Sequence, residues 1–445
     1  MPVELTAKRF TPAAVALARL SETVSPLVGI VSTLVRTTYS PDDARLPHWA
    51  CAVSPTGRTL GSPSVDYGGG SHADDLQARA AALGEAIERY SAAYVPHDRL
   101  VHATAEELGS AAVDPGRFAL FHERQLASPN FPFEPFTAST RLHFVAGYSL
   151  ADGSRAFLPA QLVYLGTPPH HGARIGYPTS NGLACGATRA EAVLGGLLEL
   201  VERDAVMIAW AGSLALPHLD WSDEPELVEL ERRYFAPSRL RYSVLDGSSL
   251  LDIPVAIAVL HGPPGERTAL ALGGGCAPTV ATAWSKALAE AFSVYRWLST
   301  KAAQDPPPAV PDARHICSFD EHMLFYADDV NAGLATFLDA SLERTPARRV
   351  PRLAAGGPRR VLDDLVARLA RHGVSVYSVD VTAPDVASLG LHVARVIAPE
   401  LCPLEVVHAA RYLGGRRLYG AARDAGLAST ALRFEDVNPH PHPFP

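Results

Sequence analysis

The stretch SNGLACGATRAEAVLGGLLELVERDAVMIAW, residues 180–210, decides how this chain folds. It opens on turn-forming Asn and Gly residues and continues as a long apolar segment, which predicts a glycine-rich loop followed by a helix. Inside the apolar segment, Glu199, Glu202, Arg203 and Asp204 stand close together. Because a buried carboxylate without a partner costs several kcal/mol, such acids normally shift their pKa, form ion pairs or bind a metal.

The same plan of loop and helix occurs twice more, in VDYGGGSHADDLQARAAALGEAIERYSAAY (65–94) and LALGGGCAPTVATAWSKALAEAFSVYRWL (270–298). Glu85 lies 15 positions after Gly70, and Glu290 lies 15 positions after Gly275. A repeat of this kind predicts an α/β (α+β) fold of strand–Gly loop–helix units, in which equivalent helices pack together.

The remaining chain divides by its patterns into further segments. Residues 1–60 are expected to form an N-terminal helix and strands, and 143–165 are expected to be rich in strands. The expected domain plan is 1–60 as the N-terminal segment, 61–300 as the core with the candidate site, 301–360 as a loop-rich insertion, 361–437 as a C-terminal α/β part, and 438–445 as a tail. Within the C-terminal part, 361–380 predict a helix, a Gly stop and a strand. The tail has a proline at every second position from Pro439, which excludes a helix and favours extended polyproline II.

Composition limits the class of protein. The chain has 445 residues, of which 47% are hydrophobic and 19% charged, as in folded rather than disordered proteins. A formal net charge of −8 gives no general attraction to nucleic acid or acidic lipid. The five cysteines are scattered without a CxxC pair or zinc-ligand spacing, which is typical of reduced thiols in a cytosol. With neither a signal pattern nor an apolar run near the ~20 residues that span a bilayer, we expect a soluble cytoplasmic protein.

The acids fall on narrow stripes of their helices. At about 100° per residue, Glu191, Glu199 and Glu202 project at about 0°, 80° and 20°. Glu85 and Glu88 are three residues apart and share a face. If the three helices converge, five carboxylates meet, namely those of Glu85, Glu88, Glu199, Glu202 and Glu290.

Five converging carboxylates would repel one another without cations. Carboxylate oxygens select hard ions such as Mg²⁺, which typically bridges protein acids and nucleotide phosphates. Arg203 and Lys286 would then offer positive charge to the phosphates. The alternative stays open, because most Glu-x-x-Glu pairs are solvated faces or pair with a neighbouring Arg. The segments GGGSHA and LGGGCAP match neither a P-loop nor the standard dinucleotide motif.

The motifs AAALGEAIERYS (80–91), SNGLACGATRAEAVLGGLLELVERDA (180–205) and KALAEAF (286–292) resemble the YcaO family, and HVARVIAPELCPL (392–404) and RYLGGRRLY (411–419) extend the resemblance. It implies an ATP site in which acids hold Mg²⁺. The implied metal ligands are Glu85, Glu88, Glu199, Glu202 and Glu290, the implied nucleotide contacts are Glu191 and Arg203, and Lys286 stands where a basic residue is usual. This sequence departs from the family at Ala81, often Ser, at Ala187, often Asn, and at Gly69, often Lys, which concerns nucleotide contacts and leaves the metal positions intact.

The tail resembles that of the azoline-forming branch of the family, which ends in Pro-x-Pro-x-Pro. Here the motif is Pro441-His442-Pro443-Phe444-Pro445. The resemblance implies that the tail enters the active site and that the terminal carboxylate of Pro445 takes part in catalysis together with Arg203 and Lys286. A proline-rich terminus without these companions would be a disordered tail.

The resemblance therefore implies an ATP-dependent cyclodehydratase that converts Cys, Ser or Thr of a ribosomal precursor peptide to thiazoline or (methyl)oxazoline. Because residues before 20 leave no room for it, we expect a separate E1-like or ThiF-like protein to bind the leader peptide. A homodimer and a downstream flavin dehydrogenase are compatible with the family. Three alternatives stay open: a thioamide- or amidine-forming enzyme, a non-catalytic scaffold that binds a peptide or partner, and a carboxylate-rich hydrolase that uses Mg²⁺ alone and is active without ATP.

Overall fold

The computed structural model describes residues 5, 7–40, 43–60, 67–167 and 172–445. The chain forms two compact units. Unit 1 comprises Met1–Thr37, Pro47–Leu200 and Ala354–Leu401, and unit 2 comprises Thr38–Leu46, Val201–Leu353 and Cys402–Pro445. The division falls inside helix α7 (Arg189–Ala211), so this helix carries residues of both units. None of the helices in the described ranges is both long and apolar enough to cross a bilayer.

Unit 1 begins as the sequence predicts, with a helix and then strands. Helix α1 (Ala13–Ser21) precedes an antiparallel sheet of β1 (Val31–Arg36), β2 (His48–Val53) and β3 (Tyr67–Ser71). Helix α3 (Asp75–Ala93) follows and packs on β2 and β3. Its first turn is capped by Asp74, whose side chain accepts from the amides of Leu76 and Gln77.

A second sheet of unit 1 has the order β4-β5-β13-β14-β7, with β6 paired to β5. Its strands are β4 (Leu100–Ala103), β5 (Leu142–Ser149), β6 (Arg155–Pro159), β7 (Leu183–Gly186), β13 (Tyr377–Asp380) and β14 (His392–Ile397). Helix α3 also packs against β7 and β14, so its apolar face, with Leu83 and Ile87, lies in the core of this unit. The region 143–165 is strand-rich as predicted.

The shorter helices of unit 1 are α2 (Gly57–Leu60), α4 (Ala105–Leu108), α5 (Glu123–Leu126), α6 (Ala160–Val163), α12 (Pro358–Arg371) and α13 (Pro384–Ser388). The predicted order of helix, Gly stop and strand over 361–380 is confirmed. Helix α12 ends before Gly373, which has a φ of +72°, and β13 follows. Glycine fits this turn because it adopts a positive φ without steric cost.

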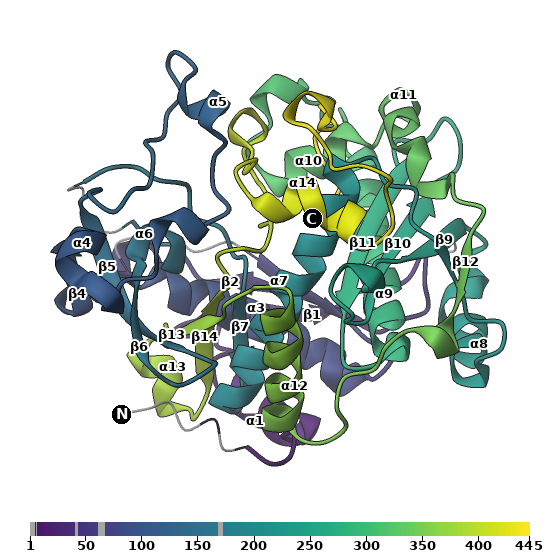
Figure 1. Cartoon of the computed structure of the whole chain (residues 1–445). Helices are drawn as coiled ribbons and strands as arrows, with labels where there is room; N and C mark the ends of the chain where they lie inside the picture. The colour runs from purple at the N-terminus through teal and green to yellow at the C-terminus, as the bar shows by residue number, and fades with distance from the viewer. Residues whose placement is uncertain (1–4, 6, 41–42, 61–66, 168–171) are drawn as a thin grey trace. The chain divides into compact units, whose positions relative to one another are not determined.

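Unit 2 contains a five-stranded sheet of order β11-β10-β9-β8-β12, against which helix α9 (Val280–Ala302) packs, as Figure 1 shows beside β10 and β11. Its strands are β8 (His218–Asp220), β9 (Arg241–Asp246), β10 (Val255–His261), β11 (Leu270–Cys276) and β12 (Arg344–Pro346), and its shorter helices are α8 (Pro225–Leu230), α10 (Phe319–Phe325), α11 (Asp329–Ala332) and α14 (Arg416–Asp424). The segment 301–360, predicted as a loop-rich insertion, also supplies edge strand β12, which pairs in parallel with β8.

One sequence prediction is wrong in detail. The glycine runs Gly68–Gly70 and Gly273–Gly275 do not form loops; they lie inside β3 and β11. The reason is close packing of strand and helix. A Cβ on Gly70 would lie 2.4 Å from the Ala78 carbonyl oxygen of α3, and one on Gly275 would lie 2.1 Å from the Ala283 carbonyl oxygen of α9. Glycine is needed here for close approach, which can mark strands as well as turns.

Candidate functional site

In each repeat a helix glutamate accepts a hydrogen bond from a glycine amide that precedes the helix. The pairs are Gly69 N to Glu85 Oε2 at 2.7 Å, Gly182 N to Glu199 Oε2 at 2.7 Å, and Gly274 N to Glu290 Oε2 at 2.5 Å. This bond engages one carboxylate oxygen and satisfies a backbone donor. It explains locally how mostly apolar helices accommodate these acids, because each carboxylate has a built-in partner.

In unit 1 the acids gather around one guanidinium. Arg89 forms an ion pair with Glu85 at 2.6 Å. Burial opposes the charge of Arg89, but the carboxylates of Glu85, Glu88 and Glu199 outweigh it and raise the pKa of Arg89. Three of the five predicted metal ligands therefore surround this residue. Arg89 is a further functional residue beyond the predicted ones. Its position directly after Glu88 matches that of Arg203 after Glu202 and could have indicated it.

Glu191 has a clear local role at the start of α7. Its Oε2 accepts from the Thr188 amide at 2.9 Å, and its own amide donates to Thr188 Oγ1 at 3.2 Å, which together form a capping box. Its Oε1 accepts from the Thr11 amide at 2.5 Å. Both carboxylate oxygens are engaged within unit 1, and contact with a nucleotide stays a prediction for this residue.

The turn before β7 is fixed by a buried arginine. Arg395 of β14, only 1% exposed, donates to the backbone carbonyls of Val163, Thr179 and Asn181. This clamp holds the turn whose next amide, that of Gly182, donates to Glu199. The position of Glu199 in unit 1 is thus supported from both its own helix and the neighbouring strand.

In unit 2 the acids lie next to each other with a lysine nearby. Glu202 Oε2 accepts from the Cys276 amide at 2.8 Å, and Lys286 Nζ lies 3.9 Å from the same oxygen. Burial, followed by the charge of Glu202, raises the pKa of Glu290 to about 8, against the opposing effect of Lys286 and Arg203. A carboxyl with this pKa sits where an added cation would be strongly favourable.

Asp204, the fourth charged residue of the opening stretch, has a structural explanation. It is fully buried, forms an ion pair with Arg417 at 2.6 Å and accepts from the Cys402 amide at 2.9 Å. A buried, paired carboxylate of this kind links α7 to residues from the C-terminal part of unit 2 and needs no ligand.

The proline-rich tail is ordered and extended. Three side chains of unit 2 hold its backbone: Trp210 Nε1 donates to the His440 carbonyl at 3.0 Å, Tyr326 Oη to that of Pro441 at 2.6 Å, and the His322 ring bonds that of His442 at 2.9 Å. The rings of His322 and His442 stack with centroids 4.0 Å apart. These contacts fix the path of the tail up to its last residues.

The end of the tail reaches the unit 2 acids. Phe444 and Pro445 line a cavity of about 20 Å³ together with Glu202, Arg203 and Glu290. Four of the predicted site residues therefore lie together, namely Glu202 and Arg203 of α7, Glu290 of α9 and Pro445 of the tail.

The donor set of each unit fits Mg²⁺. It consists of carboxylate oxygens alone, the ligands that this hard cation prefers, and it lacks the Cys and His donors typical of zinc. Desolvation, and after it the charge of Glu202, raises the pKa of Glu290, and a divalent cation nearby would oppose both effects. Within the described ranges, no three His, Cys, Asp or Glu side chains already stand at metal-binding geometry.

Comparisons with known proteins agree with this donor set. Residues 69–402 match the family model described as YcaO cyclodehydratase, ATP- and Mg²⁺-binding. A heterocyclase solved in complex with substrate and cofactor superposes with a TM-score of 0.82 at 25% identity, covering 100% of this chain and 59% of that one. The YcaO protein from Methanopyrus kandleri, bound with AMPPCP and Mg²⁺, superposes with a TM-score of 0.61 at 20% identity, covering 88% of this chain and 92% of that one, and shares the fold.

A protein of unassigned function from Methanothermobacter thermautotrophicus is 33% identical over 155 residues, which are 35% of this chain and 36% of that protein. The chain thus spans less than two thirds of this relative and of the heterocyclase.

Proposed function

Since the chain belongs to the YcaO family, whose members bind ATP and Mg²⁺, we propose that it is an ATP-dependent cyclodehydratase that forms azolines in a ribosomal precursor peptide. The observation that carries this proposal is the cavity that Pro445 shares with Glu202, Arg203 and Glu290. A terminal carboxylate next to a phosphate-binding site would be costly unless it served the reaction, because like charges repel.

The proposed reaction starts with a Cys, Ser or Thr side chain of the peptide, which attacks the preceding backbone carbonyl carbon. The thiol or hydroxyl proton leaves to a base, and the resulting oxyanion takes the γ-phosphoryl group of ATP. Elimination of phosphate, together with loss of the amide proton, then gives the thiazoline or (methyl)oxazoline. The carboxylate of Pro445 is the proposed base.

Five acids are proposed to hold Mg²⁺, namely Glu85, Glu88 and Glu199 of unit 1 and Glu202 and Glu290 of unit 2. When bound, Mg²⁺ neutralises charge on the phosphoryl groups. Arg203 and Lys286 are proposed to bind phosphate oxygens, Arg203 through its planar fork and Lys286 as a point charge. Glu191 is proposed as a nucleotide contact.

Substrate delivery is proposed to need a second protein. The superposed heterocyclase is the longer chain, and the part matched here is 59% of it. We propose that an E1-like or ThiF-like partner binds the leader of the precursor peptide, that the enzyme acts as a homodimer, and that a flavin dehydrogenase can follow it.

The test is mass spectrometry of the precursor peptide encoded beside the gene, incubated with this protein, its partner, ATP and Mg²⁺. Loss of one water per cyclised residue, matched by release of ADP and phosphate, is the expected result. Exchange of an amide oxygen for sulfur, dependent on added sulfide, would move the protein to the thioamide-forming alternative. An unchanged peptide with intact ATP would favour the scaffold.

A test of the role of Pro445 requires a variant in which the rest of the tail keeps its contacts. Appending one alanine moves the carboxylate by roughly 3.5 Å and leaves the contacts of Trp210, Tyr326 and His322 in place. We expect a fall in turnover of about 100-fold with unchanged thermal stability, a size typical of removing one acid–base group. Appending alanine with no loss of rate would remove the carboxylate from the mechanism.

A further inference from the structure

The second sheet of unit 1 is forked. Strand β6 pairs with β5 along Phe144 to Tyr148, so β4 and β13 share the opposite edge of β5. Strand β4 stops pairing at Leu100, opposite Val145, and β13 stops pairing at Ser378, opposite Tyr148. The two strands therefore separate around Ala146 and Gly147, and the split opens the sheet.

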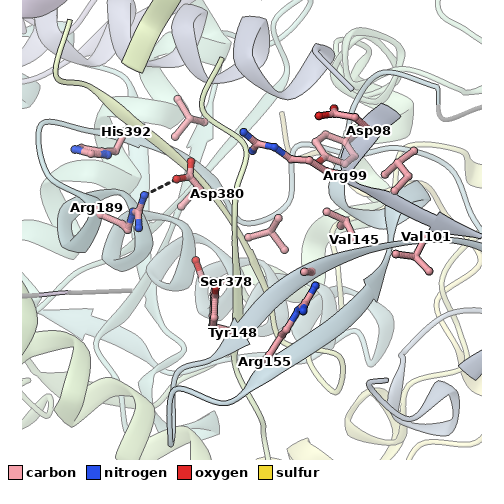
Figure 2. A pocket seen from close by; sticks show the side chains of 16 residues that line it. Asp98, Arg99, Val101, Val145, Tyr148, Arg155, Arg189, Ser378, Asp380 and His392 are labelled. Atoms are coloured by element: carbon pink, nitrogen blue, oxygen red, sulfur yellow. Dashed lines mark hydrogen bonds and ion pairs between the residues drawn. The ribbon is translucent and has the colours of Figure 1, made fainter. Parts of the chain in front are cut away.

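A cavity of about 550 Å³ fills this fork, within the 300–1,000 Å³ of common small-molecule sites. Its walls come from β4, β5, β13, β14 and the start of α7. Val145, Val379 and Val393 line part of it. Charged residues line the rest, among them Arg99, Arg155 and Asp380 (Figure 2). All of these residues belong to unit 1, and none of them is an acid of the proposed nucleotide site.

Arginines dominate the charged part. Arg99, Arg155 and Arg189 line the cavity with Asp98 and Asp380, so cationic groups exceed anionic groups by one. Arg189 is neutralised by Asp380 in an ion pair at 2.5 Å. Burial, with Arg189 acting in the same sense, lowers the pKa of His392 on the same wall, so this ring adds no charge at neutral pH.

Arg99 and Arg155 have no such neutralisation. Figure 2 shows both side chains at the cavity, Arg99 from the short 3-10 helix just before β4 and Arg155 from β6. Within the described part of the chain, neither has a carboxylate at ion-pair distance. Arg155 stacks over the Phe157 ring at 4.8 Å, which restrains its guanidinium without discharging it. Arginine forks of this kind bind carboxylate or phosphate through paired, charge-assisted hydrogen bonds.

A buried hydroxyl completes the site. Ser378 is 6% exposed, and its hydroxyl is directed into the cavity in Figure 2. Ser378 lines the cavity, and a serine hydroxyl can donate one hydrogen bond. The Ser378 hydroxyl is a donor that a ligand oxygen would satisfy.

We propose that this forked-sheet cavity binds a small organic oxyanion, a carboxylate or a phosphate monoester with an apolar body, outside the nucleotide site. Arg99 and Arg155 hold the oxyanion, the Ser378 hydroxyl donates to it, and the apolar body rests on Val145 and Val393. Carboxylate and phosphate share this chemistry, and the choice between them is decided by the probes below.

The test is isothermal titration calorimetry of the full chain with phenyl phosphate, benzoate and uncharged benzyl alcohol. A saturating, non-hydrolysable ATP analogue and Mg²⁺ are present throughout, so that the nucleotide site is occupied. We expect saturable binding of phenyl phosphate or benzoate at millimolar concentrations or below, and none of benzyl alcohol. The stronger of the two anions identifies the group that the cavity prefers.

Measuring the affinity of arginine variants shows whether the anion binds in the cavity. Arg155→Gln and Arg99→Gln remove exposed guanidinium groups and are each expected to weaken binding by about tenfold, the effect of losing about 1.4 kcal/mol of charge-assisted bonding. Arg360→Gln is the matched control, because Arg360 is also exposed and lies in unit 1 but outside the cavity; its affinity should equal that of the unmodified chain.

Three results would overturn the proposal. They are no saturable binding of either anion, equal affinity of the Arg155→Gln, Arg99→Gln and unmodified chains, or equal binding of benzyl alcohol. Binding that appears only when the ATP analogue is left out would assign the anion to the nucleotide site and also reject the cavity. The proposed cyclodehydratase activity is unaffected by any of these outcomes.

Discussion

Glu85 of unit 1 and Glu290 of unit 2 occupy the same position in two copies of one repeat, but their carboxyl groups have different neighbours. Both accept a hydrogen bond from the middle glycine of the preceding strand. Glu85 is 32% exposed and ion-paired with Arg89 at 2.6 Å. Glu290 is half-buried beside Glu202, and desolvation, followed by the charge of Glu202, raises its pKa to about 8.

The comparison separates what a local motif provides from what its neighbours decide. The glycine strand and helix set the position of the carboxylate in both copies. The charge state depends on which side chains the fold brings near, an arginine in one case and a second carboxylate in the other. In unit 1 an arginine therefore compensates the carboxylate of Glu85, whereas in unit 2 a second carboxylate contributes to the raised pKa of Glu290.

The largest expected effect is on activity. Glu290→Gln keeps an acceptor for the Gly274 amide but removes a proposed metal ligand, so we expect turnover to fall by about 1,000-fold, or about 4 kcal/mol of transition-state stabilisation. Steady-state assay of phosphate release with the precursor peptide measures it. Glu224→Gln, on the loop before α8, is the control and should keep full activity. Retained turnover in Glu290→Gln would reject the metal assignment.

The next effect tests the glycine strands. Gly275→Ala places a Cβ 2.1 Å from the Ala283 carbonyl oxygen, and because backbone cannot move aside cheaply we expect a loss of about 3 kcal/mol in the free energy of unfolding. Gly69→Ala is the matched change in unit 1, where the nearest atom, of His48, lies 3.7 Å away. It should cost less than about 1 kcal/mol. Urea denaturation gives both values, and equal losses would contradict the packing explanation.

Acid should weaken the contacts that hold the proline-rich tail in unit 2. Burial lowers the pKa of His322 to about 4 from 6.5, so the unfolded chain binds a proton that the native ring does not. The contribution of His322 to stability is then full above pH 6.5 and falls as the pH drops towards 4, by up to about 1.4 kcal/mol per pH unit. Hydrogen exchange at pH 7 and 5 should show tail peptides losing protection. His322→Gln, which cannot titrate, should reduce the slope; an unchanged slope would exclude His322 as its source.

The smallest expected effect is a change in stability, and it should have opposite signs for Glu85→Gln and Glu290→Gln at neutral pH. Without Mg²⁺, Glu85→Gln loses the ion pair with Arg89 and should destabilise the fold by about 1 kcal/mol. The ionised form of Glu290 is disfavoured in the native state, so the contribution of this one group to stability falls as the pH rises from 4.5 to about 8.

Glu290→Gln should remove that fall and stabilise the fold at pH 7, with no gain below pH 4.5. Thermal melts of the two variants across this range measure the difference. Destabilisation of the same size by both substitutions at pH 7 would show that the shared hydrogen bond, and not the charged neighbours, dominates.

The sequence by itself determined the family, the three strand–helix repeats and the acids on their helices, because these follow from local spacing. Helical periodicity places Glu85 and Glu88 on one face wherever the helix packs. The alternating prolines likewise made an extended tail predictable, since proline fixes φ and lacks an amide donor.

Only the tertiary structure decided the rest. The glycine runs predicted loops, but they lie in strands, because α3 and α9 pack so close to these strands that a Cβ would not fit. The role of Asp204 depended on Arg417, more than two hundred residues away in sequence, and the cavity at the fork depended on where β4 and β13 separate from β5. Desolvation and pairing are set by which distant segments pack together, and sequence spacing carries no record of that.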